Sequence, residues 1–285
     1  MRCQTLLVTY ILGALLVRSA TQGGDFFLPE HVKQIGTIRT SGIRESSGIA
    51  PCQKDPDVFW THTDGPRSTL FAIDRKGRSR GQVVVNVALF DWEDLASDHK
   101  GHLYIADTGN NHLTRSQIAV HEIDEPDLTQ LPSSVTVKRT WKLTFPKDPF
   151  DCESLFLWEG HGYVISKVFN NAKAVLYRFP LATTDQPLVL EKVTKLKIDS
   201  PVTAADLSRD GKKLAIICKS GAGLLQVDGD LKSAGETKPS WTKFHHEHIE
   251  ACCFVPEGLL VTAESREIYL FSGDIFRTGV SRSDR

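Results

Sequence analysis

Five acidic residues recur along the chain at intervals of 44 to 60 residues, each beside a short apolar stretch. In each repeat a second apolar stretch ends on another charged residue, 13 to 19 residues further on. Carboxylates gathered at one place could supply hard oxygen ligands for calcium. They could also act as an acid–base pair or as metal ligands in hydrolysis. The first positions are Glu45, Glu93, Glu153, Asp206 and Glu250, and the second positions are Asp64, Asp107, Lys167, Lys219 and Glu264.

The repeat indicates the fold that would bring these side chains together. Self-similarity at a period of about 50 residues is typical of propellers and other repeat architectures. Each unit contains three short β-rich runs separated by Gly, Pro, Asp and Asn, and helical periodicity is absent. A fourth, outer run precedes each acid, at Val32–Ile38, Gln82–Ala88, Val137–Phe145, Val189–Ile198 and Ser240–Phe244.

We therefore predict an all-β fold, a five-bladed β-propeller closed by the N-terminal strand. Closure of this kind protects the edges that an open sheet would expose. A six-bladed ring is the alternative, because the longest interval, from Glu93 to Glu153, has room for an extra strand pair.

In a propeller the first strand of each blade lines the central channel, and the second strand runs antiparallel beside it. Both charged positions of every unit should therefore meet at one mouth of the channel. We predict the five first-position acids as metal ligands and the five second-position residues as ligand-binding groups. Crowded carboxylates repel one another and resist burial in the charged form, so we expect protonation, neutralisation by Lys167 and Lys219, or a calcium ion.

Two other interpretations of the acids stay open. Each acid could hydrogen-bond the backbone of a neighbouring blade, which is a purely structural role. Alternatively, Glu93 or Glu153 could act directly in catalysis.

Two loops carry further candidates. Asp107–Asn111 (DTGNN), followed by Arg115, could ligate calcium or hold an anion through Asn110 and Arg115, although Gly109 and Asn110 equally suit a tight turn. The His245–Glu250 segment (HHEHIE) has the residue types of a transition-metal site. Its histidines would not share one face of an extended chain, so we favour a solvated loop, with His246 or His248 as a general-base candidate.

The ends and the composition suggest a secreted protein. The apolar run Leu6–Val17 predicts a cleaved secretory signal at residues 1–22, with a signal anchor as the alternative. We expect one propeller domain at residues 31–275 and a disordered tail at 276–285. A net charge of −1 argues against nucleic-acid partners, and no later run is long enough to span a membrane.

The mature chain keeps five cysteines and no CxxC spacing, so a thiolate zinc site is not expected and at most two disulfides can form. Trp60 and Trp92 are either exposed aromatics near the rim or core residues. We expect a monomer whose partner is an extracellular small molecule, glycan or protein.

Ordered motifs also resemble a family of secreted bacterial propeller proteins. They include ESSGIA, FWTHTD, DWEDLA, LYIADTGNN and TAADLS, and the match runs from about Glu45 to Glu264. The resemblance implies a propeller fold and puts Asp206 in register with the family's fourth acid, but it implies no reaction. Thr108 and Asn110 stand where the family has Ile and Asp in DIGDN, which leaves one acid fewer on that loop.

These observations give one leading function and two alternatives. The leading hypothesis is a calcium-centred propeller that binds an extracellular ligand at its acidic rim. The first alternative is a metal-dependent hydrolase of phosphoester or glycosidic bonds that uses the same rim. The second is that the acids are purely structural.

Overall fold

The computed structural model describes residues 28–64, 67–169, 172–244, 246, 248–273 and 276. The predicted signal segment at residues 1–22 and all but one residue of the predicted C-terminal tail lie outside this part. None of the described helices is long and apolar enough to cross a membrane.

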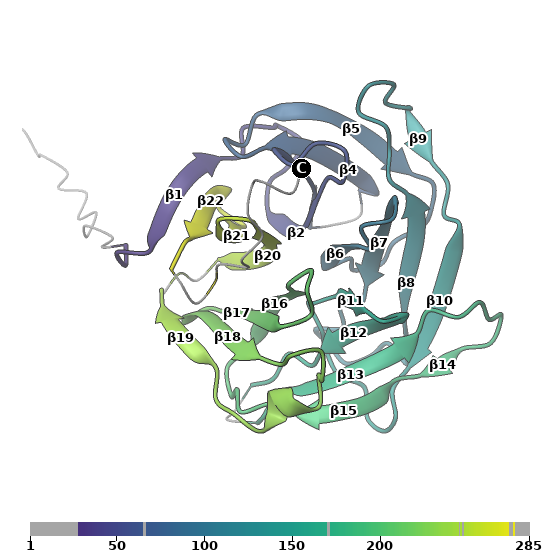
Figure 1. Cartoon of the computed structure of the whole chain (residues 1–285). Helices are drawn as coiled ribbons and strands as arrows, with labels where there is room; N and C mark the ends of the chain where they lie inside the picture. The colour runs from purple at the N-terminus through teal and green to yellow at the C-terminus, as the bar shows by residue number, and fades with distance from the viewer. Residues whose placement is uncertain are drawn as a thin grey trace, which may run out of the picture.

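Five mainly antiparallel sheets are arranged radially around a central axis, which confirms the five-bladed β-propeller (Figure 1). Blade 1 contains β2 (Ser46–Pro51), β3 (Val58–Thr63), β4 (Thr69–Asp74), β5 (Ser79–Val85) and β9 (Ser134–Val135). Blade 2 contains β6 (Asp94–Ser97), β7 (His102–Asp107), β8 (Gln117–Asp124), β10 (Arg139–Thr144) and β14 (Leu188–Val189).

The remaining three blades have four strands each. Blade 3 contains β11 (Phe156–Trp158), β12 (His161–Ile165), β13 (Val175–Pro180) and β15 (Glu191–Lys195). Blade 4 contains β16 (Val202–Leu207), β17 (Lys213–Cys218), β18 (Gly221–Gln226) and β19 (Ser240–Lys243). Blade 5 contains β20 (Ile249–Val255), β21 (Gly258–Ala263), β22 (Glu267–Phe271) and β1 (Val32–Thr37).

The N-terminal strand closes the ring, as the sequence predicted. β1 pairs antiparallel with β22, from Val32 opposite Phe271 to Thr37 opposite Glu267. In Figure 1 the first strand of the chain therefore lies beside the last. The pairing makes the outer strand of blade 5 from the opposite end of the chain, so that the two ends of the fold hold each other in place.

The six-bladed alternative is wrong. The long interval between Glu93 and Glu153 contains β9, which pairs in parallel with β5 and so extends blade 1. β14 is added to β10 of blade 2 in the same parallel way. The additional residues therefore widen existing blades at their outer edges and form no further sheet.

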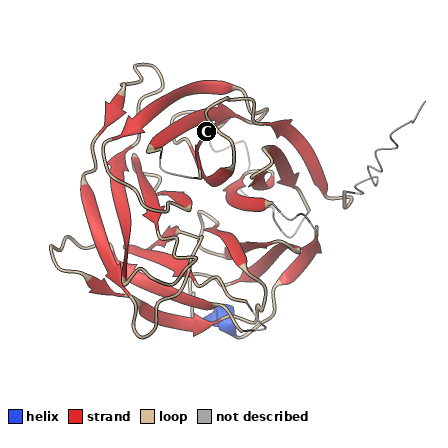
Figure 2. Cartoon of the chain, turned by 180° about the vertical axis from the view of Figure 1, so that it is seen from behind, coloured by secondary structure: helices blue, strands red, loops and turns tan. Residues whose placement is uncertain are grey.

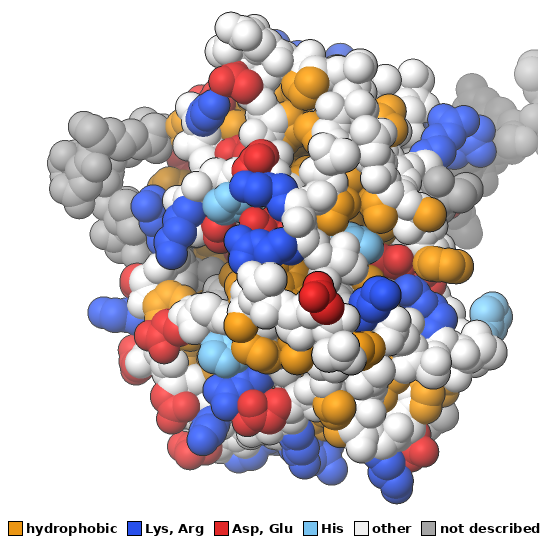
Figure 3. Space-filling model, turned by 90° about the vertical axis from the view of Figure 1, so that its right-hand side faces the viewer, with side chains coloured by type: hydrophobic (Ala, Val, Ile, Leu, Met, Phe, Trp, Pro, Cys, Tyr) orange, Lys and Arg blue, Asp and Glu red, His pale blue; other side chains and the backbone are white. Residues whose placement is uncertain are grey.

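Turn chemistry and core packing follow the sequence pattern. β11 and β12 are joined by Glu159 and Gly160, both with positive φ (44° and 73°), as a two-residue type I′ hairpin requires. The described chain contains one helix, the short 3-10 turn η1 (Ser233–Gly235), and is otherwise strand and loop (Figure 2). Apolar clusters fill the spaces between successive blades, and the side of the ring in Figure 3 shows acidic, basic and apolar side chains interspersed.

Trp60 and Trp92 are fully buried core residues. Their indole N–H groups donate to Glu125 Oε1 (2.9 Å) and to the carbonyl of Thr63 (3.1 Å). Of the two alternatives, core packing is therefore the one that the structure shows for both tryptophans.

The five cysteines of the described chain are all buried and all free thiols; they are Cys52, Cys152, Cys218, Cys252 and Cys253. Cys252 and Cys253 are neighbours in β20, where successive side chains point to opposite faces. They accordingly belong to different core clusters.

Closure by β1 predicts a matched pair of variants. Val32 is 2% exposed and packs in the core of blade 5, whereas its neighbour Lys33 is exposed. Val32→Ala should lower the free energy of unfolding by about 2 kcal/mol, and Lys33→Ala should change it by less than about 0.5 kcal/mol. Urea denaturation measures both. Equal effects would mean that β1 contributes little to closure.

Candidate functional site

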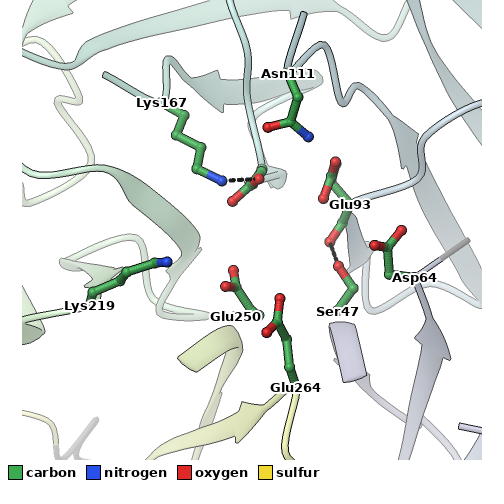
Figure 4. Close-up of a pocket in the computed structure, with 9 residues that line it drawn as sticks. Ser47, Asp64, Glu93, Asn111, Lys167, Lys219, Glu250 and Glu264 are labelled. Atoms are coloured by element: carbon green, nitrogen blue, oxygen red, sulfur yellow. Dashed lines mark hydrogen bonds and ion pairs between the residues drawn. The ribbon is translucent and has the colours of Figure 1, made fainter. Parts of the chain in front are cut away.

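Side chains from all five blades surround a cavity of about 230 Å³ on the channel axis (Figure 4). We call it the channel cavity. It is lined by Ser47, Asp64, Glu93, Asn111, Glu153, Lys167, Lys219, Glu250 and Glu264. Five carboxylates and two lysines therefore face one small cavity. A lining of this kind is suited to charged or strongly polar groups.

Seven of the residues singled out from the sequence meet in this cavity. Three come from first positions and four from second positions of the repeat: Glu93, Glu153, Glu250, Asp64, Lys167, Lys219 and Glu264. Ser47 and Asn111 also line the cavity but were not proposed as site residues. Glu45, Asp107, Asn110, Arg115, Asp206 and His246 are not among its lining residues.

The position of Glu45 is explained by strand register. The backbone N–H groups of Asp64, Lys167 and Glu264 donate to the carbonyls of Glu45, Asp151 and His248, at 3.0, 2.7 and 2.7 Å. Glu45 thus occupies the register of Asp151 and His248, two residues before the cavity position.

The residue two positions after Glu45 is Ser47, and the residues two positions after Asp151 and His248 are Glu153 and Glu250. Blade 1 therefore contributes a hydroxyl to the cavity where blades 3 and 5 contribute a carboxylate. The Ser47 hydroxyl donates to the carbonyl of Glu93 in the next blade (3.0 Å).

Blade 4 also has a hydroxyl at the equivalent strand position, although this residue does not line the cavity. Val202 pairs with Cys218 just before Lys219, as Ile249 pairs with Ala263 just before Glu264, and the register shifts after both pairs. Thr203 is thus the counterpart of Glu250, and its hydroxyl donates to the carbonyl of Ile249 (2.8 Å).

Asp206 holds two blades together instead of facing the cavity. Its carboxylate accepts hydrogen bonds from the N–H of Leu207 (2.9 Å) and from the N–H of Phe254 in blade 5 (2.7 Å). Asp94 does the same in blade 2, accepting from Leu95 and from Leu155 of blade 3, both at 2.8 Å. The equivalent of Asp206 in blade 2 is therefore Asp94, the residue after Glu93.

The polar side chains of the 107–115 loop form hydrogen bonds and an ion pair that stabilise the conformation of the loop. The Asp107 carboxylate accepts from the N–H of Asp91 (3.0 Å) and pairs with Arg115 (3.0 Å). Asn110 accepts from Arg115 N–H (2.9 Å), and its own N–H donates to Asp151 (2.7 Å). These contacts favour the turn interpretation of the DTGNN segment and place Asn111 at the cavity.

Within the HHEHIE segment, His245 and Glu247 lie outside the described residues. His246 Nδ1 accepts the N–H of His248 (3.2 Å), and its ring packs near Phe244 and Tyr269. His248 does not line the cavity but contacts a residue that does, because its Nδ1 lies 2.9 Å from Glu264 Oε2.

Burial and mutual repulsion disfavour the charged forms of the cavity acids. Burial, followed by the charges of Glu153 and Asp91, raises the pKa of Glu93 well above its usual range. Burial raises the pKa of Glu153 to about 7 against the opposing effect of Lys167. Burial together with the charges of Glu153 and Glu264 raises the pKa of Glu250 to about 8. A cation that enters the cavity would therefore stabilise the charged forms of these carboxylates.

One lysine already neutralises one of these acids. Lys167 Nζ forms an ion pair with Glu153 Oε1, whereas the buried Glu153 Oε2 has no hydrogen-bond partner in the described chain. Glu93 is 7% exposed, and no described residue forms a hydrogen bond or ion pair with its carboxylate, which points into the cavity (Figure 4). Among the described residues, lysine side chains thus neutralise only part of the negative charge in the cavity.

The charges are also unevenly distributed. Lys167 and Lys219 come from blades 3 and 4 and reach the cavity from one side, while Glu93 and Asp64 lie opposite them (Figure 4). Within the described residues no three His, Cys, Asp or Glu side chains are close enough to enclose a metal ion. A cation here would therefore complete its coordination shell with water, which calcium accepts readily among its roughly six to eight oxygen ligands.

The fold and the site define a five-bladed β-propeller with a charged cavity on its axis. No protein family and no curated protein matches the chain. Among solved structures, the chain is similar to hydrazine synthase from Kuenenia stuttgartiensis (13% identity, TM-score 0.40), with coverage of 79% of this chain and 57% of the other.

Two further solved structures show similar values. One is a chain of a mitotic checkpoint complex (13% identity, TM-score 0.42, coverage 95% and 76%). The other is a putative oxidoreductase, described as a glucose dehydrogenase, from Thermus thermophilus (10% identity, TM-score 0.46, coverage 84% and 98%). At these TM-scores none of the three supports an inference about function.

The raised carboxyl pKa values predict how stability depends on pH. A carboxyl group whose pKa is higher in the folded state than in the unfolded state binds more protons when folded, so the free energy of unfolding falls as pH rises. For Glu153 and Glu250 that fall continues up to about pH 7 and 8. Urea denaturation at pH 6.5 and pH 8 should show lower stability at pH 8, by at most about 1.4 kcal/mol per pH unit for each group.

Glu250→Gln should reduce this pH dependence, because the amide does not titrate. Glu191→Gln, on the exposed strand β15, is the matched control and should leave the pH dependence unchanged. Identical slopes in all three proteins would show that Glu250 is not desolvated in the cavity.

Proposed function

We propose that this propeller is an extracellular binding protein that holds a calcium ion in the channel cavity and binds a ligand beside it. The carboxylate of Glu93 carries the proposal, since it is nine-tenths buried, faces the cavity and has no partner among the described residues. Burying such a charge without compensation is costly. A bound cation would remove that cost.

Glu93 is the proposed direct calcium ligand, and Glu250 and the unpartnered oxygen of Glu153 are proposed to contact the ion through water molecules of its coordination shell. Glu45 and Asp206 are left out of this proposal. The first is exposed and lies outside the cavity, and the carboxylate of the second already accepts two backbone N–H groups. Secretion remains a prediction from the apolar segment at residues 6–17.

The ion can be tested by thermal unfolding with calcium and with chelator. A ligand at 100 times its Kd stabilises the folded state by about 2.7 kcal/mol, so calcium should raise the Tm by about 5–10 °C. The increase should be larger at pH 8 than at pH 6.5, because calcium competes with protons for the same carboxylates. An unchanged Tm would overturn the proposal.

Glu93→Gln should abolish the response to calcium, because it replaces the central carboxylate by a neutral amide of the same shape. Asp206→Ala is the control. It should lower the Tm by leaving Phe254 N–H unpaired, yet keep the calcium-induced increase. Loss of the response in both variants would indicate a general effect of destabilisation.

A hydrolase is the second candidate. Glu153 and Glu250 share one concave cavity and have pKa values of about 7 and 8. At neutral pH such a pair provides a carboxyl that can donate a proton and a carboxylate that can accept one, as general acid–base catalysis requires. The same carboxylates could hold a catalytic metal.

Chromogenic substrates test this candidate. With calcium present, bis-p-nitrophenyl phosphate and p-nitrophenyl glycosides should release p-nitrophenol if the cavity is hydrolytic. Glu250→Gln should then lower kcat by about a hundredfold or more, whereas Glu191→Gln should not. The absence of turnover with both substrate classes would leave ligand binding as the function of the cavity.

A further inference from the structure

We propose that the ligand of the channel cavity is a small molecule with a carboxylate or phosphate group, bound between the calcium ion and the ammonium group of Lys219. This inference rests on the proposed function, because it takes the cation in the acidic half of the cavity as given. It adds the chemical class of the ligand and a residue that recognises it.

The first argument is the state of the two lysines. Lys167 is paired with Glu153 and is partly buried. Lys219 lines the same cavity, but no described residue forms an ion pair or a hydrogen bond with its ammonium group. Lys219 is therefore the cation of the cavity that remains available to a ligand.

The second argument is the arrangement of charge. Lys219 follows β17 in blade 4, and its side chain points toward the centre from the side opposite Glu93 and Asp64 (Figure 4). A calcium ion on the acidic side would face Lys219 across the cavity. An oxyanion placed between two positive groups is stabilised by both of them.

The third argument is size and polarity. A cavity of about 230 Å³ holds a hydrated ion together with a compact polar group. All nine lining residues are polar or charged, so an apolar ligand group would gain little there. A carboxylate and a phosphate share the required chemistry, since each presents oxygen atoms to a metal ion and to an ammonium group.

Two exposed apolar side chains lie close in sequence to residues that line the cavity. Phe90 (80% exposed) lies three residues before Glu93, and Leu113 (53% exposed) lies two residues after Asn111. Arg115 packs over the Phe90 ring, 5.5 Å from its centre.

Isothermal titration of the full chain tests the proposal with three probes, namely calcium, methylphosphonate and acetate. Calcium alone should bind. At least one of the two anions should bind about tenfold or more tightly to the calcium-loaded protein than to the calcium-free protein. By thermodynamic reciprocity, that anion should increase the affinity for calcium by the same factor. The anion that binds identifies the ligand as a phosphate or a carboxylate.

Lys219→Met should weaken anion binding by about tenfold, which corresponds to the loss of one charge-assisted contact. Its affinity for calcium alone should be unchanged or slightly higher, since a nearby positive charge has been removed. Lys243→Met, on the outer strand β19 of the same blade, is the matched control and should behave like the wild type.

The outcomes separate this inference from the proposed function. If calcium binds but neither anion does, or if Lys219→Met binds the anion as the wild type does, the inference is overturned and the calcium site stands. If the anion binds equally well without calcium, the bridging arrangement is likewise overturned. If calcium itself does not bind, both proposals fail.

Discussion

The properties of the channel cavity depend on the burial of carboxylates at the axis of the propeller and on the repulsion among them. Glu93, Glu153 and Glu250 come from three different blades, and the fold brings them into one cavity with a single paired lysine, Lys167. Their raised pKa values show that the protein alone does not fully compensate their charge. Packing and hydrogen bonds such as those accepted by Asp94 and Asp206 hold neighbouring inner strands together. Bound protons or external cations are therefore needed to compensate the remaining carboxylate charge.

Acids on adjacent positions of one strand have separate roles. Glu93 faces the cavity, while Asp94 accepts backbone N–H groups from its own strand and from blade 3. Asp206 repeats the second role between blades 4 and 5. Both the structural and the binding interpretations of the acidic repeat therefore apply, but to different residues. The structural acids join neighbouring blades, whereas the cavity acids are costly to charge because they are buried near one another.

Much of the fold was predictable from the sequence, because the signals were local. The five outer runs, the short inner runs and the unpaired N-terminal run together indicated five blades and closure by β1. Second positions were also largely predictable, since each directly follows an apolar strand. Four of the five line the cavity, and Asp107 is turned away by its contact with Arg115.

First positions were harder to predict, because the innermost strands of blades 1, 4 and 5 have an irregular register near the cavity. A β-bulge changes which residue faces inward, and it leaves no clear mark in the sequence. The register shifts between Ser46 and Ile49 and between Val202 and Ala204 put Ser47 at the cavity and Thr203 at the equivalent position of blade 4, where it is buried and does not line the cavity. The structure therefore places the prominent acids Glu45 and Asp206 away from the cavity, and hydroxyl groups stand at the corresponding inner positions.

The two hydroxyls also account for the asymmetry of the site. Ser47 and Thr203 both donate to a carbonyl of the next blade, at Glu93 and Ile249, so they stabilise contacts between blades without adding charge. In blade 4 the neutral inner position is combined with a lysine at the second position, Lys219. Among the residues that the structure describes, blade 4 is thus the one blade that contributes only positive charge to the cavity. A purely structural role of the acids would not explain why Lys219 accompanies a neutral inner residue, because Thr203 and Asp206 already connect blades 4 and 5. A cation-rich side facing an acid-rich side is instead the arrangement expected for a site that receives a metal ion together with an anion.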